Sequence, residues 1–193
     1  MYKNFEKGRS MIEMLGVLAI IAVLSVGGIA GYSKAMEMHK LNKWQEELIQ
    51  TINNVQTAYL NQKSYTAKEE DITDILVAAN IISNHKDLFG NKLSIFTIGW
   101  KNYGLRFELK YQMSAGKNTV NCCKKLYELP KYYKNIWAVG DWNSYNICGK
   151  AASLQYAKEM NCQEYNISKI QQKCNACKTS SCSIGILFDN NPG

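Results

Sequence analysis

Glu13 is the residue of this sequence whose position most clearly requires a chemical partner. It stands directly before Met14–Gly31, eighteen residues without a charge, most of them Leu, Ile, Val, Ala or Gly. With its flanks, that run is long enough, at about 1.5 Å per residue, to cross a hydrocarbon core about 30 Å thick. A carboxylate at the edge of such a core costs a few kcal/mol unless it is compensated. The pattern therefore predicts that Glu13 is a functional residue.

The seven cysteines are the second group with chemical potential, and their clustering late in the chain indicates disulfides in an oxidising compartment. The candidates are Cys122, Cys123, Cys148, Cys162, Cys174, Cys177 and Cys182. An odd number leaves at least one thiol over, or paired between chains, and six paired cysteines already allow about 15 connectivities. We expect Cys122 or Cys123 to bridge to the 174–182 region, and Cys148 to pair with Cys162. Adjacent cysteines on a helix point in different directions, so Cys122 and Cys123 are expected to have different partners.

Metal and redox uses of the cysteines are disfavoured. The interval from Cys174 to Cys177 fits a zinc site, but the interval to Cys182 does not repeat it and no histidine is adjacent. A thioredoxin-like use of the same pair lacks a surrounding βαβ pattern. We therefore predict structural disulfides and no metal.

No catalytic group is evident. Asp141, Glu164 and Asp189 are isolated carboxylates, the two histidines are His39 and His85, and there is no glycine-rich phosphate loop. We predict no catalytic residue, no cofactor and no enzymatic activity. Five aromatic residues could line a sugar or partner groove, although such side chains are more often core or half-buried sheet positions: Trp100, Trp137, Trp142, Tyr132 and Tyr133.

The composition is that of one moderate domain attached to an anchor. The chain has 193 residues and a net charge of +7. A modest basic excess spread over a domain is typical of solubility, so nucleic acid is not the favoured partner.

The apolar run is interpreted as an anchor with the amino end in the cytoplasm. Lys3 and Lys7 precede it against a single acid, Glu6, although lysines also follow it. A cleaved secretory signal would have a shorter apolar region, and Ala30-Gly31-Tyr32 is a poor cleavage site. A plain signal anchor fits the length but leaves Glu13 unexplained.

The helix is predicted to continue well past the apolar run, because no proline interrupts Arg9 to Lys63. Beyond Tyr32, apolar residues recur every three or four positions, as on one face of an amphipathic helix: Leu41, Trp44, Leu48, Ile52, Val55 and Tyr59. Three glycines, at positions 27, 28 and 31, each cost about 1 kcal/mol of helix propensity. They are interpreted either as sites of close helix packing or as a hinge.

The first half of the remaining chain predicts a helix and a hairpin. Thr66–Glu69 fits a capping box that opens a short helix through Ala79, and Asn80–Asn91 is turn-rich. Leu93–Ile98 and Leu105–Tyr111 predict antiparallel strands, the second alternating apolar and charged residues. We expect one face of this hairpin to pack on the long helix.

The second half predicts short helices between further strands. The predicted helices are Thr119–Leu129, ended by Pro130, then Ser153–Met160, and one from Asn166 to Cys174. The predicted strands are Tyr132–Val139 and, after a polar turn, Ser183–Phe188.

The amino-terminal residues resemble the leader of type IV pilins and pseudopilins. The resemblance rests on Gly8, Arg9, Ser10-Met11-Ile12-Glu13-Met14-Leu15 and the long apolar helix that follows. In that family, a membrane prepilin peptidase cuts after the glycine and methylates the new amino end. The resemblance therefore implies cleavage between Gly8 and Arg9, N-methylation of Arg9, and an assembly role for Glu13, which attracts the amino group of the neighbouring subunit. The family usually has Phe or Met where this chain has Arg9.

The carboxyl-terminal thirty residues loosely resemble type IVb-like pilins, in which a disulfide brackets a surface region. Together the two resemblances imply an α+β, type IV pilin fold, with a long amino-terminal helix packed on a small antiparallel sheet and short helices. The implied organisation is a leader (residues 1–8), a transmembrane or filament-core half-helix (9–32), an amphipathic half-helix (33–63) and a Cys-rich head (64–193).

The function that this implies is a structural subunit of a type IV pilus or a type II secretion-like filament. Its partners would be identical or related pilin subunits, the prepilin peptidase, the inner-membrane assembly machinery and membrane lipid. The precursor would lie in the inner membrane, and the subunit later in a periplasmic or extracellular filament. The alternatives are a minor pilin that binds DNA or a surface ligand, and a single-pass anchored protein that never polymerises.

Overall fold

The computed structural model describes residues 11–60, 69–100, 104–141, 146–149, 152 and 154–190. The chain divides into two compact units, with the boundary between Asn42 and Lys43. The expected leader, the processing site at Gly8 and Arg9, and most of the expected capping box at residues 66–68 lie outside the described residues.

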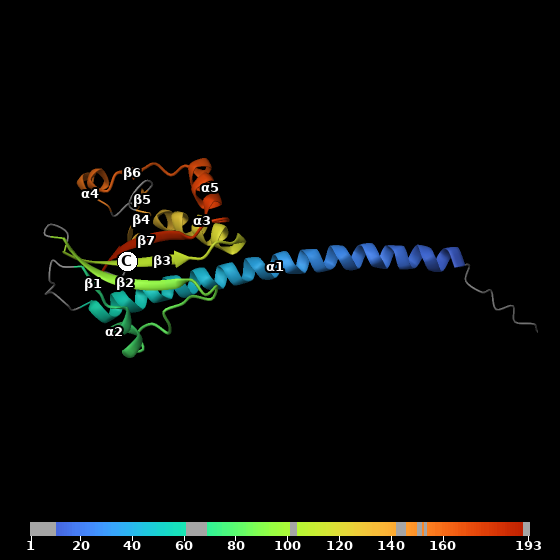
Figure 1. The fold of residues 1–193 in the computed structure, drawn as a ribbon, viewed down its shortest axis with the longest axis horizontal. Helices are drawn as coiled ribbons and strands as arrows, with labels where there is room; N and C mark the ends of the chain where they lie inside the picture. Colours follow the sequence, from blue (N-terminus) through green and yellow to red (C-terminus); the bar gives the residue numbers. More distant parts are fainter. Residues whose placement is uncertain are drawn as a thin grey trace, which may run out of the picture. The chain divides into compact units, whose positions relative to one another are not determined.

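Helix α1, Met11–Tyr59, supplies residues to both units and is coloured from blue to cyan in Figure 1. The long helix predicted by the absence of proline is confirmed over this range, while residues 9, 10 and 61–63 lie outside the described part. In the second unit, the amphipathic face predicted from the spacing is buried at Trp44, Leu48, Ile52 and Val55. The 3.6-residue period of α1 therefore places one apolar stripe against the head.

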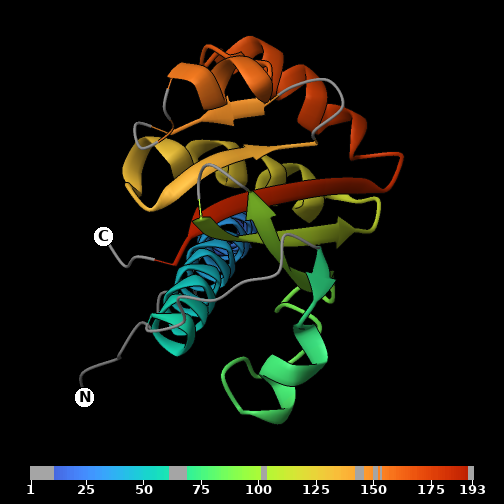
Figure 2. The same cartoon turned by 90° about the vertical axis from the view of Figure 1, so that its left-hand side faces the viewer.

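The head is built on a sheet that runs β1-β2-β3-β7-β4-β5-β6 in the described residues. Its strands are β1 (Glu70–Asp71), β2 (Lys92–Trp100), β3 (Gly104–Met113), β4 (Ile136–Gly140), β5 (Asn146–Cys148), β6 (Cys162–Gln163) and β7 (Cys182–Asp189). All neighbouring strands are antiparallel except β5 and β6, which are parallel, so the sheet is mixed and the expectation of an antiparallel sheet is wrong at that pair. The expected α+β class, with a long helix packed on the sheet, is confirmed. Figure 2 shows the last strand, β7, in red at the middle of the sheet.

The hairpin β2–β3 packs on α1 as predicted. Its apolar positions meet aromatic residues of the helix: the Tyr111 ring lies 5.8 Å from that of Trp44, and the Phe107 ring lies 5.1 Å from that of Tyr59, edge to face. Such pairs contribute about 0.5–1.5 kcal/mol beyond the apolar area that they bury. The hairpin and α1 thus form the main core of the head.

The opposite side of β3 is less exposed than its alternating pattern predicts. Arg106 and Glu108 are both buried. The Arg106 guanidinium lies 3.9 Å from the centre of the Trp137 ring, and Glu108 pairs with Lys110 at 3.3 Å. The prediction of one packed face is wrong here, because Trp137 of β4 lies over Arg106, a contact that the sequence alone does not reveal.

Four short helices complete the described head: α2 (Thr73–Ala78), α3 (Lys117–Tyr132), α4 (Leu154–Glu159) and α5 (Ile167–Ala176). The helices predicted near α4 and α5 are confirmed, and the Asn166 side chain caps α5 by accepting from the Lys169 amide at 3.0 Å. The turn-rich connection between α2 and β2 is confirmed too, with Asn80 and Gly90 at positive φ.

Element boundaries differ from those predicted by about three residues or more at α2, α3 and β4. Helix α2 begins at Thr73, after strand β1, and the Asp71 carboxylate accepts from the Thr73 amide at 3.0 Å. Helix α3 contains Pro130 instead of ending before it, because a proline in the last turn removes only one helical hydrogen bond. The following strand consequently begins at Ile136 and not at Tyr132.

Three disulfides fasten the second half of the head. They join Cys123 to Cys174, Cys148 to Cys162, and Cys177 to Cys182. The first links α3 to α5, the second β5 to the region of β6, and the third the end of α5 to β7. Cys122 is a buried free thiol, so the expectation of a disulfide partner for it is wrong. Burial raises the pKa of the Cys122 thiol to about 12, with a smaller contribution from the charge of Asp87.

Candidate functional site: an apolar helix with one carboxylate

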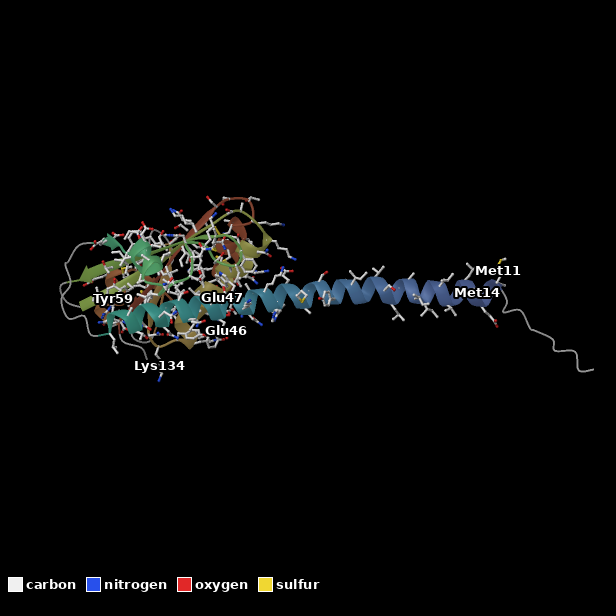
Figure 3. The ribbon with its side chains drawn as sticks, turned by 90° about the horizontal axis from the view of Figure 1, so that it is seen from below. Met11, Met14, Glu46, Glu47, Tyr59 and Lys134 are labelled. Carbon is white, nitrogen blue, oxygen red and sulfur yellow. A yellow bond between two sulfur atoms is a disulfide. The ribbon has the colours of Figure 1, made fainter. Side chains whose placement is uncertain are left out.

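The amino-terminal part of α1 exposes a continuous apolar surface. Met11 and Ile12 are each 79% exposed, and the large apolar side chains from Leu15 to Ile29 are exposed as well. Figure 3 shows Met11 and Met14 on this part of the helix. Apolar patches beyond a few hundred Å² are rare on soluble monomers and mark sites of interaction with a membrane or a protein.

This segment is long and apolar enough to cross a membrane. Its most apolar 18-residue window has a mean hydropathy of 2.4, and none of that window is buried within the protein. In hydrocarbon, the helix satisfies its own backbone, because every N–H and C=O inside it is hydrogen-bonded within the segment. The predicted single-pass anchor is therefore supported by the length, composition and exposure of α1.

Ser25 and Glu13 of this segment differ in whether they have a hydrogen-bond or ion-pair partner among the described residues. Between Met14 and Gly31, the one polar side chain is Ser25, and its hydroxyl donates to the Ile21 carbonyl at 2.7 Å. Glu13 is exposed in the first turn of the described helix, and it forms no ion pair with any residue that the structure describes. The Glu13 carboxylate is thus the charge in this surface that needs an external partner.

The helix dipole does not remove that need. An acid in the first turn of a helix is stabilised by about 0.3–1 kcal/mol. Insertion scales put the cost of a carboxylate in the membrane at up to about 3 kcal/mol at the helix centre. After Glu13, the next cation along the chain is Lys34, roughly 30 Å further along a helix. Within an apolar layer, a cation from another molecule, or from the residues before Met11, would supply the compensation.

The glycines of this segment leave its surface open to a neighbouring helix. A Cβ placed at Gly16, Gly27, Gly28 or Gly31 would meet no atom within 4 Å beyond the helix's own backbone. Helix α1 nevertheless continues through all four positions. A second helix could approach the bare backbone at these glycines closely, as the packing interpretation requires. The packing and hinge interpretations both stay predictions.

Of the aromatic residues proposed for a groove, three have side chains that the structure describes: Trp137, Tyr132 and Tyr133. Trp137 is buried in the sheet, and its indole N–H donates to the Asp189 carboxylate at 3.1 Å. Tyr132 is 64% exposed at the end of α3. Trp142 and the side chain of Trp100 lie outside the described part of the structure.

His85, Asp141 and Asp189 have local structural partners. His85 lies 3.4 Å from the Asp74 carboxylate, and Asp141 pairs with Lys173 of α5. Within the described residues, no group of three or more His, Cys, Asp or Glu side chains has a metal-binding arrangement.

Two features of the head have no signal in the sequence. One is Gln56, a buried amide that bridges two separate segments. The other is a polar cleft between α1 and the loop that follows α2. Each depends on residues far apart in the chain that only the tertiary fold brings together, so neither local periodicity nor motif spacing could reveal it.

Neither a family model, nor a curated protein, nor a solved structure matches this chain.

Proposed function

We propose that this protein is a filament subunit of the type IV pilin or pseudopilin class, made as a membrane-anchored precursor. The observation that carries the proposal is the exposed apolar surface of α1 with Glu13 at its edge. Directly before it stands the sequence Gly8-Arg9-Ser10, which resembles a prepilin processing site. An anchor alone accounts for the apolar surface but not for the carboxylate.

Processing would create the missing cation. Hydrolysis of the Gly8–Arg9 peptide bond leaves a carboxylate on the leader and a new amino group on Arg9. The peptidase would then methylate that amine, which keeps its positive charge. The new charge lies four residues from Glu13, or about 6 Å along a helix. An amine from a neighbouring subunit, shifted by this distance, would lie level with the carboxylate.

Assembly would then be driven by two terms with different roles. Packing of apolar helices keeps a large surface away from water and replaces lipid contacts by van der Waals contacts between helices. This attraction is non-directional and does not select an axial position. A carboxylate and an ammonium in an apolar layer attract strongly, and either one alone is costly there. The Glu13–amine pair would therefore set the register between subunits, while the apolar surface supplies most of the cohesion.

The test compares processing with assembly in the native host. Gly8→Ala is expected to leave an uncut precursor, and intact-mass measurement reads this directly. Glu13→Ala is expected to be processed normally but to yield no sheared filaments by electron microscopy. Thr51→Ala, a polar change on the head side of α1, is the assembly control.

Two outcomes would overturn the proposal. The first is a mature wild-type protein that begins at Met1, which would favour a non-polymerising single-pass protein. The second is a normal yield of filaments from Glu13→Ala, which would remove the carboxylate from the register mechanism.

A further inference from the structure

A cleft of about 670 Å³ lies in the head between the helix residues from Trp44 to Asn54 and the loop from Asn80 to Leu88. Hydrogen bonds join its two walls towards both ends. The Trp44 indole N–H donates to the Asp87 carboxylate at 2.6 Å, and the Asn54 amide donates to the Ile81 carbonyl at 3.1 Å. These two links are about 15 Å apart along the helix. The volume falls in the range of about 300–1,000 Å³ that is typical of small-ligand sites.

The cleft has an apolar base and polar walls. Leu48 and Ile82 are buried at its base, and Leu88 on the loop is 48% exposed. Side-chain amides and hydroxyls line both walls: Gln50, Thr51 and Asn54 from α1, and Asn80, Ser83 and Asn84 from the loop. A ligand that fits this lining must be polar at its edges and apolar on its faces.

The charges in the cleft do not favour an ionic ligand. Both oxygens of Asp87 already accept hydrogen bonds, from the amides of Phe89 and Asn91 and from the side chains of Trp44 and Asn91. Asp87 is therefore a structural residue that holds the loop. Glu47 on the helix and Lys86 on the loop remain, with opposite charges. The Glu47 carboxylate has no hydrogen bond or ion pair to another described residue, so it is available to accept from a ligand.

We propose that this cleft binds a short neutral oligosaccharide. Sugar hydroxyls both donate and accept, so one ligand can donate to Glu47 and accept from the amides of Gln50, Asn80 or Asn84. A pyranose ring also has apolar C–H faces, which match the buried base and Leu88. The site goes beyond filament assembly and does not depend on it, because assembly is assigned to residues before Tyr32.

An extended peptide fits this part of the head less well. Peptides commonly bind by adding a strand to an exposed sheet edge. The edge of β2 beside the cleft loop is already occupied: the Ile95 amide donates to the Thr73 hydroxyl, and the Leu93 amide donates to the His85 carbonyl at 2.7 Å. The walls that remain offer side chains and not a free strand, which favours a ligand recognised through hydroxyl groups.

The test uses the full chain in lipid nanodiscs, because many detergents carry sugar headgroups. The protein is applied to an array of neutral oligosaccharides, and the affinity for the best-retained one is measured by calorimetry. Glu47→Gln is expected to weaken binding about tenfold, since the acceptor loses its charge and its second carboxylate oxygen becomes an NH2 donor. Asn84→Ala, on the opposite wall, is expected to weaken binding of the same sugar.

The matched control is Glu46→Gln, on the next residue of the same helix. Glu46 is exposed and does not line the cleft; Figure 3 labels both glutamates. It is expected to bind as the wild type does, and near-ultraviolet circular dichroism checks that all three variants fold. The proposal is overturned if no oligosaccharide on the array is retained, or if Glu47→Gln binds as tightly as Glu46→Gln. Retention of a peptide library through Glu47, with no sugar bound, would assign the cleft to a peptide instead.

Discussion

Among the polar residues of α1, Gln56 is expected to contribute most to holding the helix against the rest of the head. Its side chain is completely buried. The amide N–H donates to the Asp189 carbonyl at 2.7 Å, at the end of β7, and the amide oxygen accepts from the Asn135 side chain at 2.9 Å, just before β4. One side chain of α1 therefore joins the helix to two strands that are neighbours in the sheet.

Replacing Gln56 with leucine keeps a similar volume and removes both bonds. The Asp189 carbonyl and the Asn135 amide then lose a partner, and an unsatisfied buried polar group costs about 1–3 kcal/mol. Asn135 is only half-buried and can recover part of this loss from water. We expect a decrease in the free energy of unfolding of about 2–4 kcal/mol, from the carbonyl and the incompletely recovered amide together. For a domain of this size, the melting temperature would fall by roughly 5–15 °C.

The assay is thermal and urea unfolding of the full chain in nanodiscs, followed by near-ultraviolet circular dichroism under oxidising conditions. Gln50→Leu is the control, because it makes the same chemical change at an exposed position of the same helix. It is expected to change the free energy of unfolding by less than about 0.5 kcal/mol. If Gln56→Leu has the same melting temperature as Gln50→Leu, the two hydrogen bonds of Gln56 do not stabilise the head and the prediction is wrong.

Further predictions concern the cysteines. Replacing Cys123 and Cys174 together with serine opens a loop of 51 residues and is expected to cost about 4 kcal/mol in the chain-entropy model, measured by urea unfolding. The same change at Cys177 and Cys182, which close a separation of 5, should cost only about 2 kcal/mol, and the reverse order would contradict the model. Cys122 should resist iodoacetamide at pH 8, because burial raises the pKa of its thiol to about 12, and one thiol per chain should react once urea unfolds the protein. Rapid labelling of the folded chain would show that the Cys122 thiol is accessible to iodoacetamide, which contradicts the prediction.

The parts of the fold that were predictable are those set by local periodicity. The buried face of α1 from Trp44 to Val55 follows from a 3.6-residue repeat, and the hairpin β2–β3 follows from alternation around a turn. The cap at Asn166 follows from the preference of asparagine for the position before a helix. In each case the signal lies within a few consecutive residues.

The remainder depends on contacts between distant segments. The central position of β7 depends on its pairing with β3 and β4, which are distant from it in the sequence. Its buried run from Ile184 to Phe188 is nevertheless typical of an inner strand. The parallel pairing of β5 with β6 joins segments whose Cys148 and Cys162 are also bridged. The burial of Arg106 requires Trp137 from another strand. No local pattern contains the strand pairings or the Arg106–Trp137 contact, so the sequence does not predict them. The bridge between Cys148 and Cys162, by contrast, is expected from the sequence.

The two parts of α1 make different demands on their surroundings, and this difference supports the proposed change from membrane to filament. Residues after Lys43 pack within the head, whose core draws on its own sheet and helices. Residues 11–32 are exposed along their whole length and contribute nothing to that core. Neighbouring helices can therefore replace lipid around this surface without disturbing the packing of the head. Glu13 would then distinguish the membrane from the filament. Lipid tails carry no charge that could pair with its carboxylate, whereas a processed neighbouring subunit carries an amine.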